Sequence, residues 1–469
     1  MNNKAHWGIM GLGVMGTSLS RNLGRNGVSL ALYNRNLKRS EEKVAEQRIQ
    51  SYPELKNALA YEELVPFINA IETPRKLLLM LPAGEVTDHV LKELIPLLDR
   101  GDVVIDGGNS HYETTDKRAA HFKDIGIRFL GMGVSGGKEG ALRGPSLMLG
   151  GDPDAYLLVE KDLQSIAAKN KKNDPCCGYV GRGGAGHFVK MVHNGIEYAE
   201  MQLIAEVFEI ALSDPEISIQ KLQKIFEEWQ NTQSQNYLLS ITSEILQYQE
   251  NGVPFIELIE DKASNKGTGA WASSSGAQLG SPNSLMTAAL HSRFTSFLKQ
   301  ERVSLAKHFD LPKRTQNISL THLKKTYDLS RWINHHQGFE MIRVAANQYQ
   351  WEIELSKIAS LWSEGCIIKS SLMCQLIEDF TKFPNLLEIP TFKTLLNQGE
   401  KDWENLMVQS LKQHVSTPCI SGAWNYFRAM TQENSSANLI QAQRDFFGRH
   451  GFHRVDLSDG LLHHGPWAK

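Results

Sequence analysis

Four polar residues in one apolar segment have a spacing that could support chemistry. Residues 188–208 read FVKMVHNGIEYAEMQLIAEVF, with Lys190, His193, Asn194 and Glu197 among the apolar residues. In a helix these positions are i, i+3, i+4 and i+7, so the four side chains share one face over two turns. Lys190 and Glu197 would lie about 10 Å apart along the axis. They could bracket a small substrate, one acting as base and the other as acid.

The residues around this polar patch predict that the helix is buried. A mixed polar stripe on a helix is more often a solvated face, but Met201, Ile204 and Phe208 continue the same stripe. A helix that is apolar nearly all round is usually buried, where a lysine or a glutamate is costly without a polar partner. We therefore expect the patch to face a ligand inside the protein.

Length, charge and cysteine content set the class of protein. The chain of 469 residues is long enough for two or three domains. Its net charge of -2 gives no reason to expect nucleic acid or an anionic membrane as a partner. The odd set of five cysteines has no C-x-x-C spacing, which argues against a disulfide framework or a zinc site. Because no signal peptide or membrane-spanning run is seen, we expect a cytoplasmic protein.

The first residues predict a dinucleotide-binding unit. A strand ending at Ile9 and Met10 leads into Gly11, Gly13 and Gly16, and a helix and a second strand over 28–33 follow. Glycines at these positions permit the tight turn and let the backbone approach a pyrophosphate, while the helix N-terminus offers its N–H groups. At the end of the second strand Arg35 stands where an NAD enzyme has an acid. An arginine there suits a 2′-phosphate, so we favour NADP, with a solvated turn residue as the alternative.

Further apolar runs predict a doubly wound parallel sheet followed by a helical region. Runs at 76–84, 101–110 and 127–137 each end in a loop of small residues, and such loops converge on one crevice at the carboxyl ends of the strands. From about residue 181 to 435 the periodicity is helical. The aromatic and basic residues of the last segment are unlike those of a disordered tail. We expect an α/β domain at 1–180, an all-helical domain at 181–435 and an ordered tail at 436–469.

The combination of motifs resembles the decarboxylating 6-phosphogluconate dehydrogenases. GLGVMG, DGGNS, VSGG, GPSLMLGG, GAGHFVKMVHNGIEY, NKGTGAW, GCIIKS and QAQRDFFGRH follow one another in family order along essentially the whole chain. The resemblance implies a Rossmann-like NADP-binding domain, a helical catalytic and dimerisation domain, and a tail that reaches the other subunit of a homodimer. It also implies oxidative decarboxylation of 6-phosphogluconate to ribulose 5-phosphate and CO2, a step of the pentose phosphate pathway.

The resemblance assigns a role to each matching residue. Lys190 would take the proton of the substrate 3-hydroxyl and later act as an acid, and Glu197 would protonate the enediol. A β-keto acid loses CO2 readily when an acid supports the enolate, so no metal is expected. Substrate contacts would come from Asn109, Ser135, Gly136, Gly137, His193, Asn194, Tyr198, Lys266, Thr268 and Arg293, with Arg444 and His450 from the partner's tail. Cofactor contacts would come from Gly11, Leu12, Gly13, Val14, Met15, Gly16, Asn34, Arg35, Asn36 and Asn109.

The sequence departs from the family pattern at four positions, and two other functions remain as alternatives. Pro82 and Ala270 stand where lysine is common, Lys138 replaces an acid and Asn36 a threonine; none removes a catalytic group, and they bear on cofactor preference and affinity. A non-decarboxylating 3-hydroxyacid dehydrogenase would share the glycine loop and the helix lysine, but its family is much shorter. A non-catalytic NADPH-binding regulator could share the fold. Loss of Lys190 or Glu197 would favour the regulator, and both are present.

Overall fold

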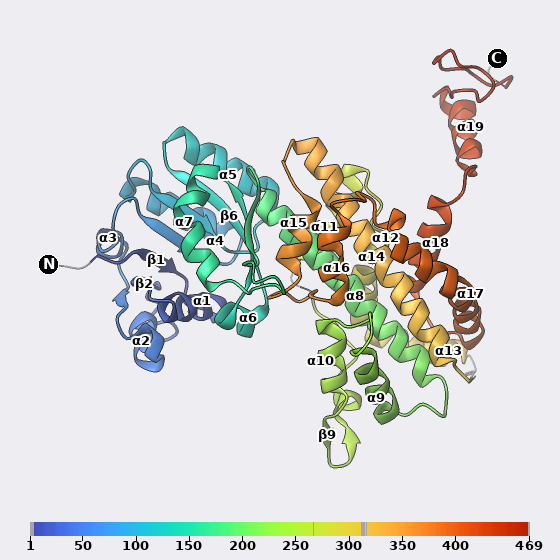
Figure 1. Cartoon of the computed structure of the whole chain (residues 1–469), viewed down its shortest axis with the longest axis horizontal. Coiled ribbons are helices and arrows are strands. Elements are labelled where there is room, and N and C mark those ends of the chain that lie inside the picture. Colours follow the sequence, from blue (N-terminus) through green and yellow to red (C-terminus); the bar gives the residue numbers. More distant parts are fainter. Residues whose placement is uncertain (1–3, 266, 311–314, 316, 468–469) are drawn as a thin grey trace.

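The amino-terminal part of the chain folds around one eight-stranded sheet (Figure 1). The computed structural model describes residues 4–265, 267–310, 315 and 317–467. The strands follow the spatial order β3-β2-β1-β4-β5-β6-β7-β8. Neighbouring strands are parallel except β6 and β7, which pair antiparallel. The strands are β1 (Trp7–Met10), β2 (Leu30–Tyr33), β3 (Leu59–Tyr61), β4 (Lys76–Leu79), β5 (Val103–Asp106), β6 (Arg128–Ser135), β7 (Ser146–Gly151) and β8 (Cys177–Gly181).

Helices cover both faces of this sheet, as predicted for a doubly wound fold. Two buried apolar clusters lie on opposite faces: one receives side chains of α1, α6 and α7, and the other receives side chains of α3, α4 and α5. Strands β4 and β5 are buried along their whole length, which explains their continuous apolar sequences. The helices are α1 (Val14–Arg25), α2 (Val44–Ser51), α3 (Leu64–Asn69), α4 (Glu85–Leu94), α5 (Tyr112–Asp124), α6 (Gly137–Arg143) and α7 (Pro153–Ile166).

The carboxyl-terminal part is mostly helical and is organised around two long helices. Helix α8 (Ala185–Leu212) packs on β6 and β7 at one end and against α14 (Leu320–Tyr349) in the helical region. A hairpin of β9 (Gln249–Glu250) and β10 (Val253–Pro254) extends from the bundle (Figure 1). The other helices are α9 (Ile219–Trp229), α10 (Tyr237–Ile245), α11 (Thr268–Leu279), α12 (Ser284–Phe297), α13 (Lys299–Phe309), α15 (Leu355–Trp362), α16 (Ser371–Asp379), α17 (Pro390–Gln413), α18 (Pro418–Met430) and α19 (Ala437–Gly448).

The last segment leaves the body of the molecule. After α18 the chain runs out to α19, which projects from the bundle together with the final loops (Figure 1). This tail is folded on itself around the buried carboxylate of Asp445. The carboxylate accepts hydrogen bonds from the N–H groups of Gly451 at 3.0 Å and Gly465 at 2.9 Å and from Nε1 of Trp467 at 3.0 Å. Such internal bonding explains why the tail sequence does not resemble a disordered end.

Two expectations from composition can be compared with the structure. All five cysteines are free thiols, as expected from their spacing. Among the described residues, no helix combines the length and the apolar character needed to cross a membrane.

Candidate active site

Helix α8 lies directly on strands β6 and β7 because a glycine stands at the point of contact. A Cβ atom added at Gly186 would come within 2.6 Å of the backbone nitrogen of Gly150 and of the carbonyl oxygen of Met148, and closer still to the carbonyl oxygen of Gly131. Only a residue without a side chain fits between the helix and these two strands. This close approach sets the height of the whole helix above the sheet.

The same contact continues along the helix in register with β6. Alternate residues of the strand face successive turns of α8, because side chains repeat every two residues in a strand and every three to four in a helix. A Cβ added at Gly131 would come within 2.9 Å of Nδ1 of His187, and one added at Gly133 within 2.5 Å of Cβ of Lys190. Ser135, the next residue on this face, places Oγ 3.1 Å from Nε2 of His193. The strand glycines therefore make room for Lys190 at the end of the sheet.

The polar face of α8 is buried, as its sequence predicts. Lys190 and Asn194 are each 8 % exposed, and His193 is fully buried. Nζ of Lys190 lies 3.4 Å from Nδ1 of His193, and that nitrogen lies 3.3 Å from Oδ1 of Asn194. Desolvation lowers the pKa of Lys190, against the opposing attraction of Glu197. Desolvation also holds the pKa of His193 well below its usual value, so the imidazole beside Lys190 is neutral.

Three further predicted residues, Glu197, Tyr198 and Arg293, lie on or beside the next turns of α8. Oε2 of Glu197 lies 3.7 Å from Nδ1 of His193, and its side chain is 22 % exposed, which leaves the carboxylate accessible to a ligand. The guanidinium of Arg293, on α12, stacks 3.5 Å from the ring centroid of Tyr198. Arg293 also donates to the carbonyl of Ser264 at 3.0 Å. The arginine is thus fixed beside the polar face of α8, where a positive charge can meet an anionic ligand group.

A pocket brings residues of both parts of the chain to Lys190. Its lining combines the loop after β5, the polar face of α8 and the start of α11: Asn109, Ser110, His187, Lys190, Met191, Asn194, Thr268 and Trp271. Asn109, Lys190, Asn194 and Thr268 were predicted site residues. Ser135 ends β6 beside His193, and Gly136 and Gly137 follow with φ values of 116° and 61°, turning the chain into α6. The carboxyl ends of two strands thus meet the polar face of α8.

Two predicted substrate residues lie away from this pocket in the single chain, and a third cannot be placed. Lys266 lies outside the described residues. Arg444 and His450 belong to the projecting tail, far from α8 in Figure 1. Arg444 donates to Gln441 within α19 at 3.1 Å.

The glycine loop after β1 has the shape that a dinucleotide requires. Gly11 adopts a φ of 89°, and a Cβ added at Gly13 would project into open space. Gly13 is also the N-cap of α1, where N–H groups are free to meet a phosphate. The N–H of Leu12 donates to Oδ1 of Asn34 at 3.0 Å, so the loop is tied to the end of β2. Val14 is 64 % exposed at the first position of α1, next to the space that a cofactor would fill.

The end of β2 presents an arginine that is already paired with an acid. Nη2 of Arg35 lies 3.3 Å from Oε1 of Glu41, and Asn34 donates to the other carboxylate oxygen at 3.0 Å. Asn36 donates to Oε2 of Glu62 at 2.9 Å. Arg35 is 60 % exposed along its side chain, so its guanidinium can reach a 2′-phosphate. The glycine loop and the end of β2 fit a dinucleotide cofactor.

Four residues that line the pocket were not predicted as site residues: Ser110, His187, Met191 and Trp271. Ser110 belongs to a loop that was predicted as a whole, and Met191 is one of the apolar residues of α8. Trp271 ends the NKGTGAW motif, in which only Lys266 and Thr268 were assigned to the site. His187 is 2 % exposed, and burial lowers its pKa. His187 precedes Lys190 by three residues, so the two side chains lie on the same face of the helix. This spacing is the sequence feature that indicates His187 as a neighbour of the site.

Comparison with known proteins gives the same assignment along the whole chain. Two family models match, the NAD binding domain of 6-phosphogluconate dehydrogenase over residues 6–181 and the 6-phosphogluconate dehydrogenase C-terminal domain over residues 186–467. The decarboxylating 6-phosphogluconate dehydrogenase of Aggregatibacter actinomycetemcomitans is 38 % identical and covers 100 % of this chain and 97 % of its own. The NAD(+)-dependent, decarboxylating enzyme of Bacillus subtilis is 37 % identical, covering 97 % and 98 %.

A solved structure agrees with the fold. The 6-phosphogluconate dehydrogenase of Plasmodium falciparum, described in its apo form and in complex with NADP+ and with 6-phosphogluconate, superposes with a TM-score of 0.93. It is 30 % identical in sequence, and the match covers 98 % of this chain and 100 % of the Plasmodium chain. Family models, full-length relatives and the fold all lead to one conclusion: the chain belongs to the 6-phosphogluconate dehydrogenase family.

Proposed function

We propose that this protein oxidises and decarboxylates 6-phosphogluconate to ribulose 5-phosphate and CO2, with NADP as the oxidant. The observation that carries the proposal is the environment of Lys190. Lys190 is buried, and desolvation lowers the pKa of its ammonium. The neighbouring imidazole of His193 is neutral. A lysine in such surroundings gives up its proton more readily than an exposed lysine and can act as a general base.

The side chains around the pocket support an order of proton transfers. When bound, NADP would accept the hydride from C3 of the substrate. Neutral Lys190 would take the proton of the 3-hydroxyl, and the resulting ammonium would support negative charge on the same oxygen while the carboxylate leaves as CO2. Glu197, about two turns along α8 from Lys190 and partly exposed, would then deliver a proton to C1 of the enediol. His193 and Asn194 would hold substrate oxygens between these two groups.

The charged residues beyond Glu197 suit the phosphate end of the substrate. Arg293 and Tyr198 stack on one another at the far end of the polar face, and Thr268 begins α11 nearby. We assign Lys266 to the same group from its motif. Binding the phosphate at this end would orient C1 to C3 towards Lys190, because charge-assisted bonds fix one end of a ligand.

NADP is favoured over NAD by Arg35 at the end of β2. The Plasmodium protein is described with NADP+, whereas the Bacillus relative is named NAD(+)-dependent, so family membership leaves the choice to local residues. Arg35 would turn from Glu41 to the 2′-phosphate, a contact that NAD cannot offer. No metal is needed for these steps, and we expect activity to persist in EDTA.

A homodimer with exchanged tails would complete the site. The tail exposes large apolar side chains, which are costly to leave in water and typical of a surface that packs on a partner. They include Leu439, Ile440, Phe446 and Phe447. Arg444 and His450 lie in the same segment and would reach the partner's phosphate site. We accordingly divide the chain into a cofactor domain at 1–180, a helical catalytic and dimerisation domain at 181–435 and a tail at 436–469. The five free thiols suit the cytoplasm.

One assay tests the proposed reaction and separates it from the alternatives. Purified protein is mixed with 6-phosphogluconate and either NADP or NAD, absorbance is followed at 340 nm, and released CO2 is measured in the same sample. Reduced cofactor and CO2 in equal amounts, faster with NADP, are the expected result. Reduced cofactor without CO2 would favour a simple 3-hydroxyacid dehydrogenase. No signal with either cofactor would favour a non-catalytic binder.

A further inference from the structure

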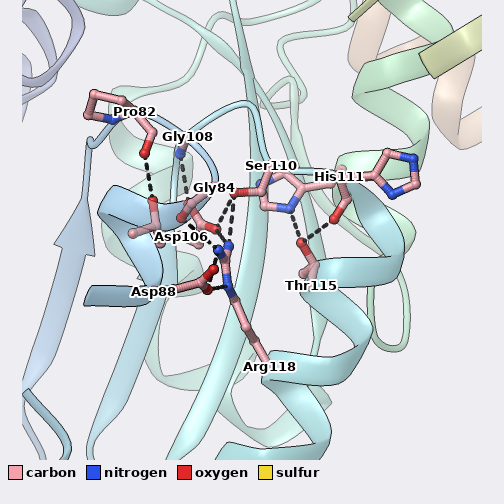
Figure 2. Close-up of polar contacts among 11 residues, drawn as sticks. Pro82, Gly84, Asp88, Asp106, Gly108, Ser110, His111, Thr115 and Arg118 are labelled. Carbon is pink, nitrogen blue, oxygen red and sulfur yellow. Dashed lines mark hydrogen bonds and ion pairs between the residues drawn. The ribbon is translucent and has the colours of Figure 1, made fainter. Parts of the chain in front are cut away.

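A buried arginine on α5 joins the loops that follow two strands of the sheet (Figure 2). Arg118 is 7 % exposed. Its Nη1 donates to Oδ2 of Asp106 at 2.8 Å and to Oγ of Ser110 at 3.1 Å, at the end of β5. Its Nε and Nη2 donate to Oδ1 of Asp88, on α4, at 2.9 and 2.7 Å. One guanidinium therefore connects α4, α5 and the end of β5.

Asp106 holds both neighbours of Asn109. Oδ1 of Asp106 accepts the N–H of Gly108 at 3.0 Å, and Oδ2 accepts the hydroxyl of Ser110 at 2.6 Å (Figure 2). Gly108 and Ser110 are buried, whereas Asn109 between them is exposed and lines the pocket of Lys190. Fixing the two flanking residues leaves the Asn109 side chain directed at the site. The fully buried carboxylate of Asp106 can do this only while Arg118 balances its charge.

The other end of the guanidinium reaches the loop after β4. Nη2 of Arg118 donates to the carbonyl of Gly84 at 3.4 Å, and Asp88 follows one turn into α4. The hydroxyl of Thr87 donates to the carbonyl of Pro82 at 2.9 Å, which closes the same loop. In an open α/β sheet the ligand lies beyond the carboxyl ends of such strands. The arginine thus fixes the loops after β4 and β5 relative to each other.

A second contact links the loop after β5 to α8. Oγ1 of Thr115 donates to the carbonyl of His111 at 3.2 Å (Figure 2). The same oxygen lies 2.7 Å from Nδ1 of His187. His187 is one turn before Lys190 on the same helix. The loop that carries Asn109 and the helix that carries Lys190 are therefore joined through α5.

We propose that Arg118 is a positioning residue for hydride transfer: through Asp106 and Gly84 it fixes Asn109 and the two loops between which the nicotinamide and the substrate C3 meet. Arg118 touches neither ligand in this assignment. The proposal rests on the function proposed above. Its consequence is that loss of Arg118 slows the hydride step while the adenosine and pyrophosphate contacts, which lie at the glycine loop and Arg35, remain intact.

A second buried arginine offers a matched control. Arg75 precedes β4, is 8 % exposed and bonds Asp99 and Asp102 at 2.7 Å each. It is thus the counterpart of Arg118 at the amino ends of the same strands, away from the pocket. Arg118→Met and Arg75→Met each remove a buried guanidinium from two aspartates of one domain. Both should lower the melting temperature, and only Arg118→Met should change the chemical step.

The experiment compares turnover, cofactor binding and an isotope effect in the full-length enzyme. For Arg118→Met we expect kcat to fall roughly 10- to 100-fold, the cost of misplacing reacting groups by about 1 Å, with the NADPH dissociation constant changed less than about threefold. The primary isotope effect with 6-phosphogluconate deuterated at C3 should rise, because hydride transfer becomes slower than the other steps. A mere loss of folded enzyme would lower kcat and leave the isotope effect unchanged.

Milder variants keep the test informative if Arg118→Met does not fold. Asp88→Asn removes the charge of a partner whose side chain is 45 % exposed, and it should raise the isotope effect in the same direction. Arg118→Lys keeps the charge beside Asp106 and should recover part of kcat. Isotope effects equal to wild type in both Asp88→Asn and Arg118→Lys, or an equal rise in Arg75→Met, would overturn the proposal. An inactive wild-type protein would instead refute the proposed function.

Discussion

Replacing Lys190 by methionine should abolish turnover and at the same time stabilise the fold. Methionine keeps an unbranched apolar stem in the space between α8 and Gly133 and removes only the ammonium. Lys190 is 8 % exposed, its Nζ lies 3.4 Å from a neutral imidazole, and desolvation lowers the pKa of the ammonium. A group kept in such surroundings for catalysis is a cost to the folded state.

The expected gain in the free energy of unfolding follows from the burial of the Lys190 ammonium. A buried polar group without full compensation costs roughly 1–3 kcal/mol in mutational data. A swap that nearly conserves volume adds less than about 1.5 kcal/mol of packing loss. We therefore expect Lys190→Met to raise the free energy of unfolding by about 1–3 kcal/mol near neutral pH, less any loss from imperfect packing.

The lowered pKa of Lys190 determines how the stability of the fold changes with pH. The unfolded lysine titrates near 10.5, and the folded one at lower pH. Between these two values the unfolded chain binds more protons, so the wild-type protein becomes more stable as the pH rises through this window. Below the folded pKa the whole penalty is present. Because methionine does not titrate, its advantage over wild type should be largest at low pH and shrink as the pH approaches 10.5.

Thermal unfolding of both proteins from pH 6 to 10 measures this difference, with the 340 nm assay as the activity readout. Lys76→Met is the matched control, because Lys76 is also buried but lies 3.3 Å from a carboxylate oxygen of Asp162. Removing a cation from a paired carboxylate should destabilise the fold. If Lys190→Met is less stable than wild type by the same amount at every pH, Lys190 is a structural cation and the reasoning about its base function is wrong.

Three other substitutions test separate parts of the site. Gly186→Ala should cost about 1–3 kcal/mol or more, because its methyl group would collide with backbone atoms of β6 and β7, and calorimetry should show the lower melting temperature. Arg35→Glu should raise KM for NADP far more than for NAD; equal changes would show that Arg35 does not read the 2′-phosphate. Asp445→Asn should raise KM for 6-phosphogluconate without dissociating the proposed dimer on a sizing column. The carboxylate holds the tail loops beside Arg444 and His450, and the N–H of Gly465 and other donors lower its pKa to about 2. An unchanged KM would exclude the tail from substrate binding.

The periodicity of the sequence was sufficient to predict features that lie within a single helix or strand. The polar face of α8 follows from the spacing of four residues, and β4 and β5 follow from continuous apolar runs. Strand β7 could not be found in this way. Its sequence SLMLGG ends in two glycines and its partner β6 runs antiparallel, so the pairing depends on a reversal of the chain through α6 that no local pattern encodes.

Contacts between elements account for the other residues that sequence analysis missed. Gly131 and Gly133 alternate along β6, and in the sequence they indicate only a weak strand. Their purpose depends on which helix crosses that strand and at what height, which is decided by Gly186 more than 50 residues later. A glycine in a strand and a glycine in a helix each appear unfavourable alone, and become favourable once they face each other.

Arg118 is a charged residue within the buried stripe of α5, as Lys190 is on α8. In the sequence α5 is strongly polar, and an arginine there is naturally assigned to a solvated face. The buried residues of α5 are nevertheless Tyr112, Thr115, Arg118 and Phe122, a single stripe at helical spacing in which one member is charged. Lys190 was found because it interrupts an apolar stripe of α8. A charge inside such a stripe must meet an opposite charge or a ligand, because burial without a partner is too costly. Lys190 lines the pocket and Arg118 meets Asp106, so the same pattern points to chemistry on one helix and to its support on another.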